Sequence, residues 1–388
     1  MLSLALTLAI FAVAAAVEDT AAAAAARVAE CLLRAPGLSE AARQQLLKHS
    51  SRDSPQPYDG GALEAHHRAL LAATRRFREG VPVHSWAGYR GPWIENHFIA
   101  RFGALPQRSF GPLVPLFVQW TDLHVYEIST PQEKRNASIP AYGRLHLEIA
   151  ALLRPDVLYV AVTQDDEGLG TLTRLRPNVL SISAGGYGHI AIPLVKGELP
   201  QVPVPPKWNA AVGFYGQVRP RLARAGMLAE LGQLLKGLKV PTTSHPTEEW
   251  ATAIAGTALN LAPRGFGRTS FRVAEIVQIG RVPVYIWDDA PWLPYAEGGG
   301  GNGSFSSFGL SSPRSALPQL ARRMQHLLQP EGRQELEALL LNAAAARPLY
   351  TYDGVLRQLQ LFFAQPLEPG PGPEGGLLRC VRLPNKPH

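Results

Sequence analysis

Arginines, glycines and one glutamate gather at a single predicted turn in the second half of the sequence. The segment PRGFGR at residues 263–268 follows an apolar run, and the helix-like stretch after it contains Arg272 and Glu275. The start of a helix exposes unpaired backbone N–H groups and the positive end of the helix dipole, and both favour a phosphate group. Gly265 and Gly267 allow the backbone to approach a ligand closely, and the arginines add charge-assisted hydrogen bonds. The turn is therefore predicted to bind an anion.

Glu275 gives this predicted anion site a second function. It lies three residues after Arg272, near the start of the helix, where its carboxylate could accept hydrogen bonds from ribose hydroxyls. This combination favours a nucleotide diphosphate, and the alternative is a glycine turn with a solvated Arg272–Glu275 ion pair. Thr269 or Ser270 would cap the helix. The candidate nucleotide-binding residues are Arg264, Gly265, Arg268, Ser270, Arg272 and Glu275.

The elements that must position these residues follow a strand–helix–strand pattern. TALNLA before the turn and RVPVYIW after the helix are predicted strands, and Val273 and Ile276 lie on the helix face that would pack on their sheet. Earlier apolar runs at residues 113–120, 157–164 and 178–183 alternate with helix-like segments. This alternation predicts an α/β domain with a largely parallel sheet.

A proline-rich segment divides the chain into two predicted domains. The prolines within residues 193–206 exclude a helix or a central strand there, and a second α/β series follows from residue 212. A chain of 388 residues with 46% hydrophobic and 18% charged residues fits a globular protein of two domains. In such sheets ligands bind outside the carboxyl ends of the strands, so the turn would face an interdomain cleft.

The stretch from residue 259 to residue 295 resembles the signature of the exostosin-like glycosyltransferases. That signature has an apolar strand, Pro-Arg-Gly, Ser-Phe-Arg, a glutamate, Gly-x-x-Pro-Val, and Leu-Pro followed by Phe or Tyr. Weaker similarity extends the resemblance to residues 85–297. The chain departs from the family at Ala262, where Cys is frequent, and in the glycine-rich stretch after Tyr295. The matching residues are Pro263, Arg264, Gly265, Ser270, Phe271, Arg272, Glu275, Gly280, Pro283, Val284, Leu293 and Pro294.

This resemblance implies a GT-B fold, in which two Rossmann-like domains face each other across a cleft. It also implies an inverting glycosyltransferase that uses a nucleotide-sugar donor, usually a UDP-sugar, and that needs no metal. The C-terminal domain would hold the nucleotide, and the acceptor would be a glycan or a glycoprotein. One alternative is a transferase-like fold without catalysis, acting as a glycan-binding protein or partner subunit. Another is a secreted module that binds polyanions.

An inverting transfer needs a base that takes the proton of the acceptor. Asp165 and Asp166 follow the predicted strand YVAVTQ and are the preferred candidates, and His124 after the run LFVQW comes next. Taken singly, each of them is better explained as a loop-solvating or structural residue. Asp288 and Asp289 form a carboxylate pair, but a polar strand exit explains them without a metal, so no metal site is expected. Further options for the base are Glu95, His97, Asp122 and Glu167.

The charge and the chain ends indicate the partners and the compartment. The formal charge of +7 comes from scattered arginines, which favours a phosphate-bearing ligand or an anionic polymer over nucleic acid. Residues 2–17 are apolar and indicate a cleaved signal peptide, a type II membrane anchor or a disordered leader. Cys31 and Cys380 could form a bridge or remain two thiols. The sequons at Asn136 and Asn302 agree with passage through the secretory pathway.

The predicted layout has four parts. Residues 1–26 form the signal peptide or anchor, residues 27–200 the acceptor-side α/β domain, and residues 201–350 the nucleotide-sugar domain. Residues 351–388 form a C-terminal helix and a Pro/Gly-rich tail. The expected location is the Golgi lumen, with secretion as the alternative.

Overall fold

The computed structural model describes most of the chain. The predicted leader up to residue 20 and the Asn302 sequon lie outside the described residues, as do the two residues after Asn136. Among the described residues, no helix is long and apolar enough to cross a membrane. The described residues are 21–50, 60–86, 89–136, 139–218, 223–235, 242–243, 247–295, 304–368 and 376–381.

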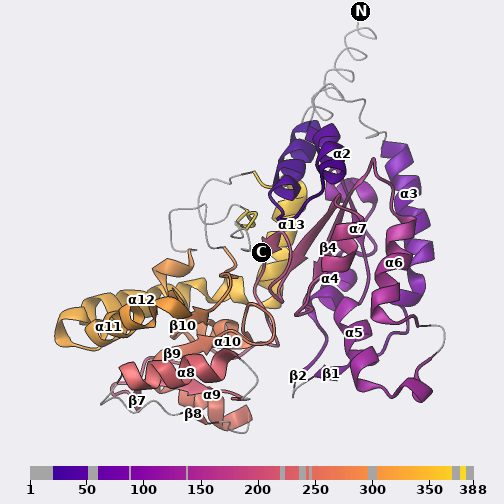
Figure 1. Cartoon of the computed structure of the whole chain (residues 1–388). Helices are drawn as coiled ribbons and strands as arrows, with labels where there is room; N and C mark the ends of the chain where they lie inside the picture. Colours follow the sequence, from indigo (N-terminus) through magenta and orange to yellow (C-terminus); the bar gives the residue numbers. More distant parts are fainter. Residues whose placement is uncertain are drawn as a thin grey trace, which may run out of the picture.

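Two parallel sheets with helices on their faces form the body of the molecule (Figure 1). The strands of the first sheet are, in spatial order, β3 (Leu113–Leu116), β4 (Leu158–Thr163), β5 (Val179–Ser183) and β6 (Ile190–Ala191). The strands of the second sheet are, in spatial order, β11 (Leu310–Pro313), β10 (Val282–Trp287), β9 (Thr257–Pro263), β7 (Ala210–Tyr215) and β8 (Thr242–Thr243). Every neighbouring pair in both sheets runs parallel. The predicted α/β fold with two domains is confirmed.

Strand β4 shows how the first sheet is covered on both faces. The helices around it are α2 (Glu40–Ser50), α3 (Gly60–Ala73), α4 (Ile94–Phe102), α5 (Trp120–Ser129), α6 (Tyr142–Leu152), α7 (Gly170–Leu175) and α13 (Tyr352–Ala364). Successive side chains of a strand point to opposite faces. Tyr159 and Ala161 therefore share a buried apolar cluster with α3, α5 and α6, whereas Val160 and Val162 share one with α4 and α13.

The second sheet is covered in the same way. Its helices are α8 (Ala223–Leu234), α9 (Thr247–Ala255), α10 (Phe271–Ile279), α11 (Leu317–Leu327) and α12 (Arg333–Ala346). Leu259 and Leu261 of β9 pack in a cluster with α8, α11 and α12, whereas Ala262 and Tyr285 belong to a cluster with α9 and α10. Strand β9, helix α10 and strand β10 are the predicted strand–helix–strand unit, and this prediction is confirmed.

The two domains are joined by a shared apolar core as well as by the chain. One buried cluster contains residues from both sheets. The proline-rich segment at residues 193–206 has no regular structure, as predicted. Helix α13 returns from the C-terminal domain to the N-terminal one, where Phe363 lies near Phe98 of α4, with ring centroids 6.0 Å apart (Figure 1).

A disulfide ties the two ends of the described chain together. Cys31, in a helix over residues 21–33, is bonded to Cys380, which also forms a β-bridge with Ile190 of the first sheet. Of the two alternatives for the cysteines, the structure therefore contains the bridge. Ala24 and Ala25 of the same helix are buried. The last residues assigned to the leader, 21–26, thus belong to a packed helix.

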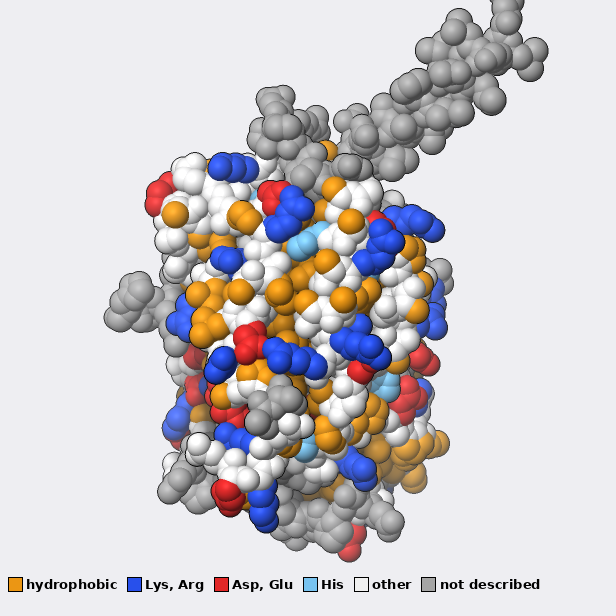
Figure 2. All heavy atoms as spheres, turned by 90° about the vertical axis from the view of Figure 1, so that its right-hand side faces the viewer, with side chains coloured by type: hydrophobic (Ala, Val, Ile, Leu, Met, Phe, Trp, Pro, Cys, Tyr) orange, Lys and Arg blue, Asp and Glu red, His pale blue; other side chains and the backbone are white. Residues whose placement is uncertain are grey.

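The outer face of the N-terminal domain carries its basic side chains singly. Figure 2 shows Lys and Arg side chains scattered among apolar and acidic ones on this face. The positive charge of this face is therefore dispersed over its described residues rather than gathered in one patch.

Candidate active site

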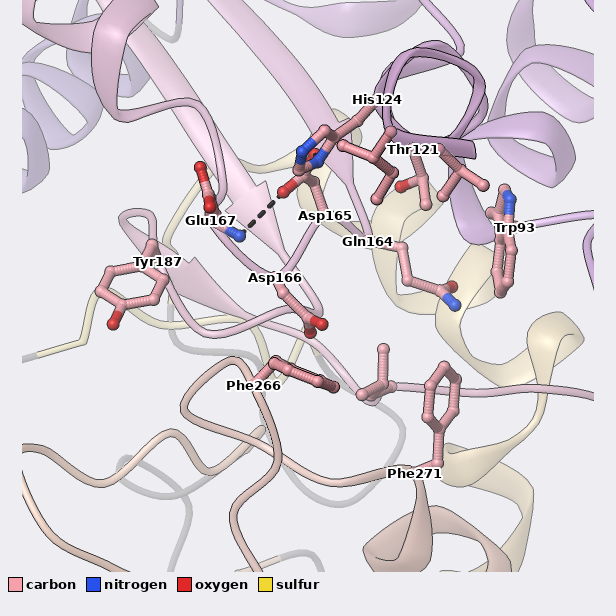
Figure 3. A pocket seen from close by; sticks show the side chains of 13 residues that line it. Trp93, Thr121, His124, Gln164, Asp165, Asp166, Glu167, Tyr187, Phe266 and Phe271 are labelled. Carbon is pink, nitrogen blue, oxygen red and sulfur yellow. Dashed lines mark hydrogen bonds and ion pairs between the residues drawn. The ribbon is translucent and has the colours of Figure 1, made fainter. Parts of the chain in front are cut away.

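A cleft with a volume of about 500 Å³ lies between the two domains (Figure 3). Its N-terminal wall comes from α5 and from the segment after β4, and includes His124 and Asp166. The opposite wall includes Phe266 in the loop after β9 and Phe271, the first residue of α10. The cleft therefore lies at the carboxyl ends of strands from both sheets, where the sequence predicts a ligand site.

His124 and Asp165 form a hydrogen-bonded pair in the N-terminal wall. His124 Nδ1 lies 2.7 Å from Asp165 Oδ2, and the imidazole stacks on Tyr142 with ring centroids 4.6 Å apart. Burial alone would lower the pKa of His124, but the hydrogen bond and charge of Asp165, with the charges of Glu167 and Glu127, raise it above its ordinary value. Two of the three predicted catalytic residues are thus brought together.

Asp166, the third predicted catalytic residue, lies between the two walls (Figure 3). Its half-buried carboxyl group faces the cleft and the other domain. Burial and the charge of Asp165 raise its pKa to about 7, against opposing effects from the Gly267 backbone, His124 and Arg264. A carboxyl group that changes charge near neutral pH is typical of functional sites.

Glu95 and His97, two further candidates for the base, have structural surroundings. Buried Glu95 accepts hydrogen bonds from the backbone N–H groups of Thr121, at 2.6 Å, and Gln164, at 3.2 Å. It thereby fixes the start of α5 to the end of β4. His97 stacks on Tyr352 with ring centroids 3.9 Å apart and does not line the cleft.

The prediction that Asp122 and His124 directly follow a strand is wrong. Strand β3 ends at Leu116, and both residues lie in the first two turns of α5. The run LFVQW is apolar in the strand and in the helix start alike, so hydrophobic periodicity does not mark the boundary. The helix directs His124 to the cleft and Asp122 into the core, where Asp122 Oδ1 accepts a 3.0 Å hydrogen bond from the Trp93 indole.

Two glycine-rich segments from opposite domains meet beside the cleft. A Cβ atom on Gly267 would lie 1.9 Å from the carbonyl oxygen of Gly185, and one on Gly186 would lie 2.4 Å from the backbone nitrogen of Arg268. The Arg268 guanidinium lies 4.3 Å from the centroid of the Tyr187 ring, which adds a cation–π contact between the domains. We call the contact made by Gly185, Gly186, Gly267 and Arg268 the glycine seam. Gly186 and Gly267 are required in this contact because a side chain at either position would clash with the backbone of the other domain and force the domains apart.

Helix α10 is capped at both ends. The hydroxyl of Ser270 accepts a 3.3 Å hydrogen bond from the backbone N–H of Arg272, so Ser270 is the N-cap rather than Thr269. Gly280 ends the helix in the left-handed conformation, with φ of 82°. Gly265 does not point its N–H outward, because that group donates to the Thr269 carbonyl at 2.8 Å and closes the loop.

Arg272 and Glu275 form a buried ion pair at the start of α10. Arg272 Nη1 and Glu275 Oε2 are 2.7 Å apart, and the two side chains are 8% and 6% exposed. The alternative of a solvated pair is therefore wrong. The Arg272 guanidinium also lies 4.4 Å from the centroid of the Trp250 ring. Among the described residues, neither of the two facing atoms has a well-aligned hydrogen-bond partner, so the pair is only partly satisfied.

The other two arginines of the turn are held by the carboxylate pair after β10. Arg264 Nη1 lies 2.7 Å from Asp288 Oδ1, and Arg268 Nε lies 2.7 Å from Asp289 Oδ2. Among the described residues, no group of three or more histidines, cysteines or carboxylates is placed to hold a metal ion. Through their two ion pairs, Asp288 and Asp289 hold the arginines of the turn.

The sequence does not predict a site function for the aromatic residues Trp250, Trp93 and Tyr187. Trp250 comes from α9 and meets Arg272 only through the fold, and nothing in the sequence around it signals this contact. Trp93 lines the cleft from a position before α4. Tyr187 stands inside SAGGYGH, whose glycines were the only local signal of a close approach.

Comparisons with known proteins find a likeness in structure but none in sequence. No family model matches the sequence, and no curated protein matches it. Among solved structures, the chain is similar to an alpha-glucosyltransferase in complex with UDP and a 13-mer DNA containing a central A:G mismatch. The sequence identity is 10% and the TM-score is 0.26, and the match covers 53% of this chain and 72% of that chain.

Proposed function

We propose that the protein is an exostosin-like glycosyltransferase that moves a sugar from a UDP-linked donor to a glycan or glycoprotein acceptor with inversion. The observation that carries this proposal is the buried Arg272–Glu275 pair at the capped start of α10. Phe271, the residue before Arg272, lines the cleft, whereas Arg272 and Glu275 are buried and are not among the described residues that line it.

The chemistry of the pair fits a nucleoside diphosphate. A buried cation and carboxylate that face each other with poor hydrogen-bond geometry gain little, because both have lost water. A diphosphate would give Arg272 a charge-assisted partner, and ribose hydroxyls would donate to Glu275. The N–H groups in the first turn of α10 add the positive end of a helix dipole to the same place.

Stabilisation of the departing diphosphate is the second task of this site. Arg264 and Arg268 lie in the loop before α10, and their ion pairs with Asp288 and Asp289 fix the guanidinium groups at the end of the sheet. Positive groups fixed in advance stabilise the charge that develops on a leaving group. The proposed transfer therefore relies on arginines and a helix dipole rather than on a metal ion.

The disulfide supports a location in an oxidising compartment. Cys31 and Cys380 are bonded although they lie 349 residues apart in the chain. Such bonds persist in the secretory pathway and outside the cell, and are rare in the cytosol. We place the protein in the secretory pathway, in the Golgi lumen, where nucleotide-sugars and their acceptors meet.

A donor panel tests the proposed reaction. The full chain would be incubated with UDP-glucose, UDP-galactose, UDP-xylose, UDP-N-acetylglucosamine and GDP-mannose, and the released nucleotide would be measured with water or mixed glycans as acceptor. We expect release from at least one UDP-linked donor and a loss of about 100-fold or more in Glu275→Gln. Arg333→Ala, which removes an exposed arginine on α12, should match the wild type. UDP binding without any release would favour the non-catalytic alternative instead.

A further inference from the structure

His124 is the group in the N-terminal wall that combines exposure with a fixed orientation. Its side chain is 22% exposed in the cleft, while its partner Asp165 is fully buried. Asp165 Oδ2 holds Nδ1, and the stacked Tyr142 ring fixes the plane of the imidazole. Within the described part of the chain, Nε2 has no hydrogen-bond partner, so it is the ring nitrogen left for a ligand.

Asp165 is not placed to take a proton from an acceptor. Its side chain is 0% exposed, and both of its oxygens are used. Oδ2 meets His124 Nδ1, and Oδ1 accepts a 2.8 Å hydrogen bond from the backbone N–H of Glu167. A carboxylate in this position fixes the tautomer of its histidine, with the proton on Nδ1 and the lone pair on Nε2.

Asp166 faces the cleft, but its carboxyl group packs against the other domain. A Cβ atom on Gly267 would lie 2.9 Å from Asp166 Oδ1, so the carboxyl group packs directly against the glycine seam. A base must reach the acceptor hydroxyl at hydrogen-bond distance. His124 can reach an acceptor in the cleft, whereas Asp166 is held against Gly267 in the loop after β9.

We propose that His124 is the general base that takes the acceptor proton, and that Asp165 is the residue that positions it. This inference rests on the proposed glycosyltransferase function. The acceptor oxygen forms a bond to the anomeric carbon of the donor sugar while the bond from that carbon to the diphosphate oxygen breaks. The bonding electrons leave with UDP, and the hydroxyl proton passes to His124 Nε2, which later releases it to water.

The groups around His124 set the expected pH dependence. It faces Asp165 and Glu167 from the segment after β4, Glu127 from its own helix, and Tyr142 and His146 from α6. Since the neutral imidazole is the base, the rate should rise with pH through the pKa of His124. Asp165 raises this pKa above the ordinary value of 6.5, so the rising limb should lie above pH 6.5.

The decisive experiment compares His124→Gln with Asp165→Asn and Asp166→Asn. UDP affinity would be measured by calorimetry, and nucleotide release from the best UDP-sugar of the donor panel as a function of pH. We expect His124→Gln to keep the UDP affinity and to lose about 100- to 10,000-fold in kcat. Asp165→Asn should lower kcat and move the rising limb to lower pH. Asp166→Asn should also lower kcat, because its carboxyl group packs against the glycine seam, but by less than about tenfold, well short of a general-base loss.

Three outcomes would overturn the assignment. His124→Gln with near wild-type turnover sinks it while the proposed function stands, and so does a loss confined to Asp166→Asn. If the wild-type protein neither binds UDP nor releases UDP from any donor, the proposed function is wrong, and the assignment of the base is wrong with it. If His124→Gln does not fold, the pH–rate profile of Asp165→Asn decides. A rising limb at the same pH as in the wild type would contradict the positioning function of Asp165.

Discussion

Asp166 has a strongly raised pKa in this cleft. Burial and neighbouring Asp165 raise its pKa from 3.8 to about 7, so the folded protein binds a proton that the unfolded chain has released. Stability from this proton is complete below pH 3.8 and is lost as the pH rises through about 7. The ionised form of Asp166 therefore lowers the stability of the fold, although the Gly267 backbone and Arg264 of the other domain favour that form.

Asp166→Asn should remove this pH dependence. Relative to the wild type, the variant is expected to gain stability as the pH rises from about 4 to about 7, because Asn cannot ionise. The check is the urea midpoint of both proteins across this range. A constant difference between the two midpoints at every pH would contradict the raised pKa of Asp166.

At the scale of elements, helix α10 carries both the fold and the proposed donor site. Its cap, Ser270, holds the backbone of Arg272, and residues 272–279 are buried. The first turn must stay wound for Arg272 and Glu275 to face each other. Loss of the cap should therefore act on stability and on nucleotide binding together.

Ser270→Ala is expected to lower the free energy of unfolding by about 1 kcal/mol. It should also weaken UDP binding several-fold, because the first turn of α10 frays when its backbone N–H loses a partner. Ser270→Thr keeps a hydroxyl acceptor and serves as the matched control. Urea unfolding and UDP calorimetry measure the two effects, and full stability in the alanine variant would contradict the role of the cap.

The sequence predicts features that depend on neighbouring residues better than contacts between segments that are far apart in the chain. The strand–turn–helix at residues 257–279 carries local marks, namely an apolar run, glycines and a capping residue, so the sequence predicts this element. The ion pairs of Arg264 and Arg268 join β10 to the turn across the sheet, and Trp250 reaches Arg272 from another helix. Contacts between distant segments leave no such local mark. For the same reason, the sequence does not predict the positioning function that we propose for Asp165.

At the scale of the molecule, the glycine seam sets the distance between the two proposed halves of the site. His124 belongs to the N-terminal domain and Arg272 to the C-terminal one, so transfer requires both domains to stay close. Trp292 adds a second link, because its indole donates a 3.1 Å hydrogen bond to the Ser183 carbonyl. The seam is thus expected to control turnover more than nucleotide affinity.

Gly267→Ala tests this function of the seam. The new methyl group would meet the Gly185 carbonyl and Asp166, both in the other domain, so the cleft should open. We expect kcat to fall by about 100-fold, since small misplacements of reacting groups cost this much. UDP affinity should change only a few-fold, and the radius of gyration from small-angle X-ray scattering should increase. Gly170→Ala has no atom within 4 Å of the new methyl group and is the control.

The proposed nucleotide-sugar site is tested most directly by calorimetric titration of UDP into the full chain. We predict saturable binding to the wild type and to the exposed-arginine control Arg333→Ala. In Arg272→Ala the affinity should fall by about 10- to 100-fold, the value of a charge-assisted hydrogen bond. Wild-type protein that shows no binding of UDP, or equal binding by Arg272→Ala, would contradict the assignment of a nucleotide-sugar site at the start of α10.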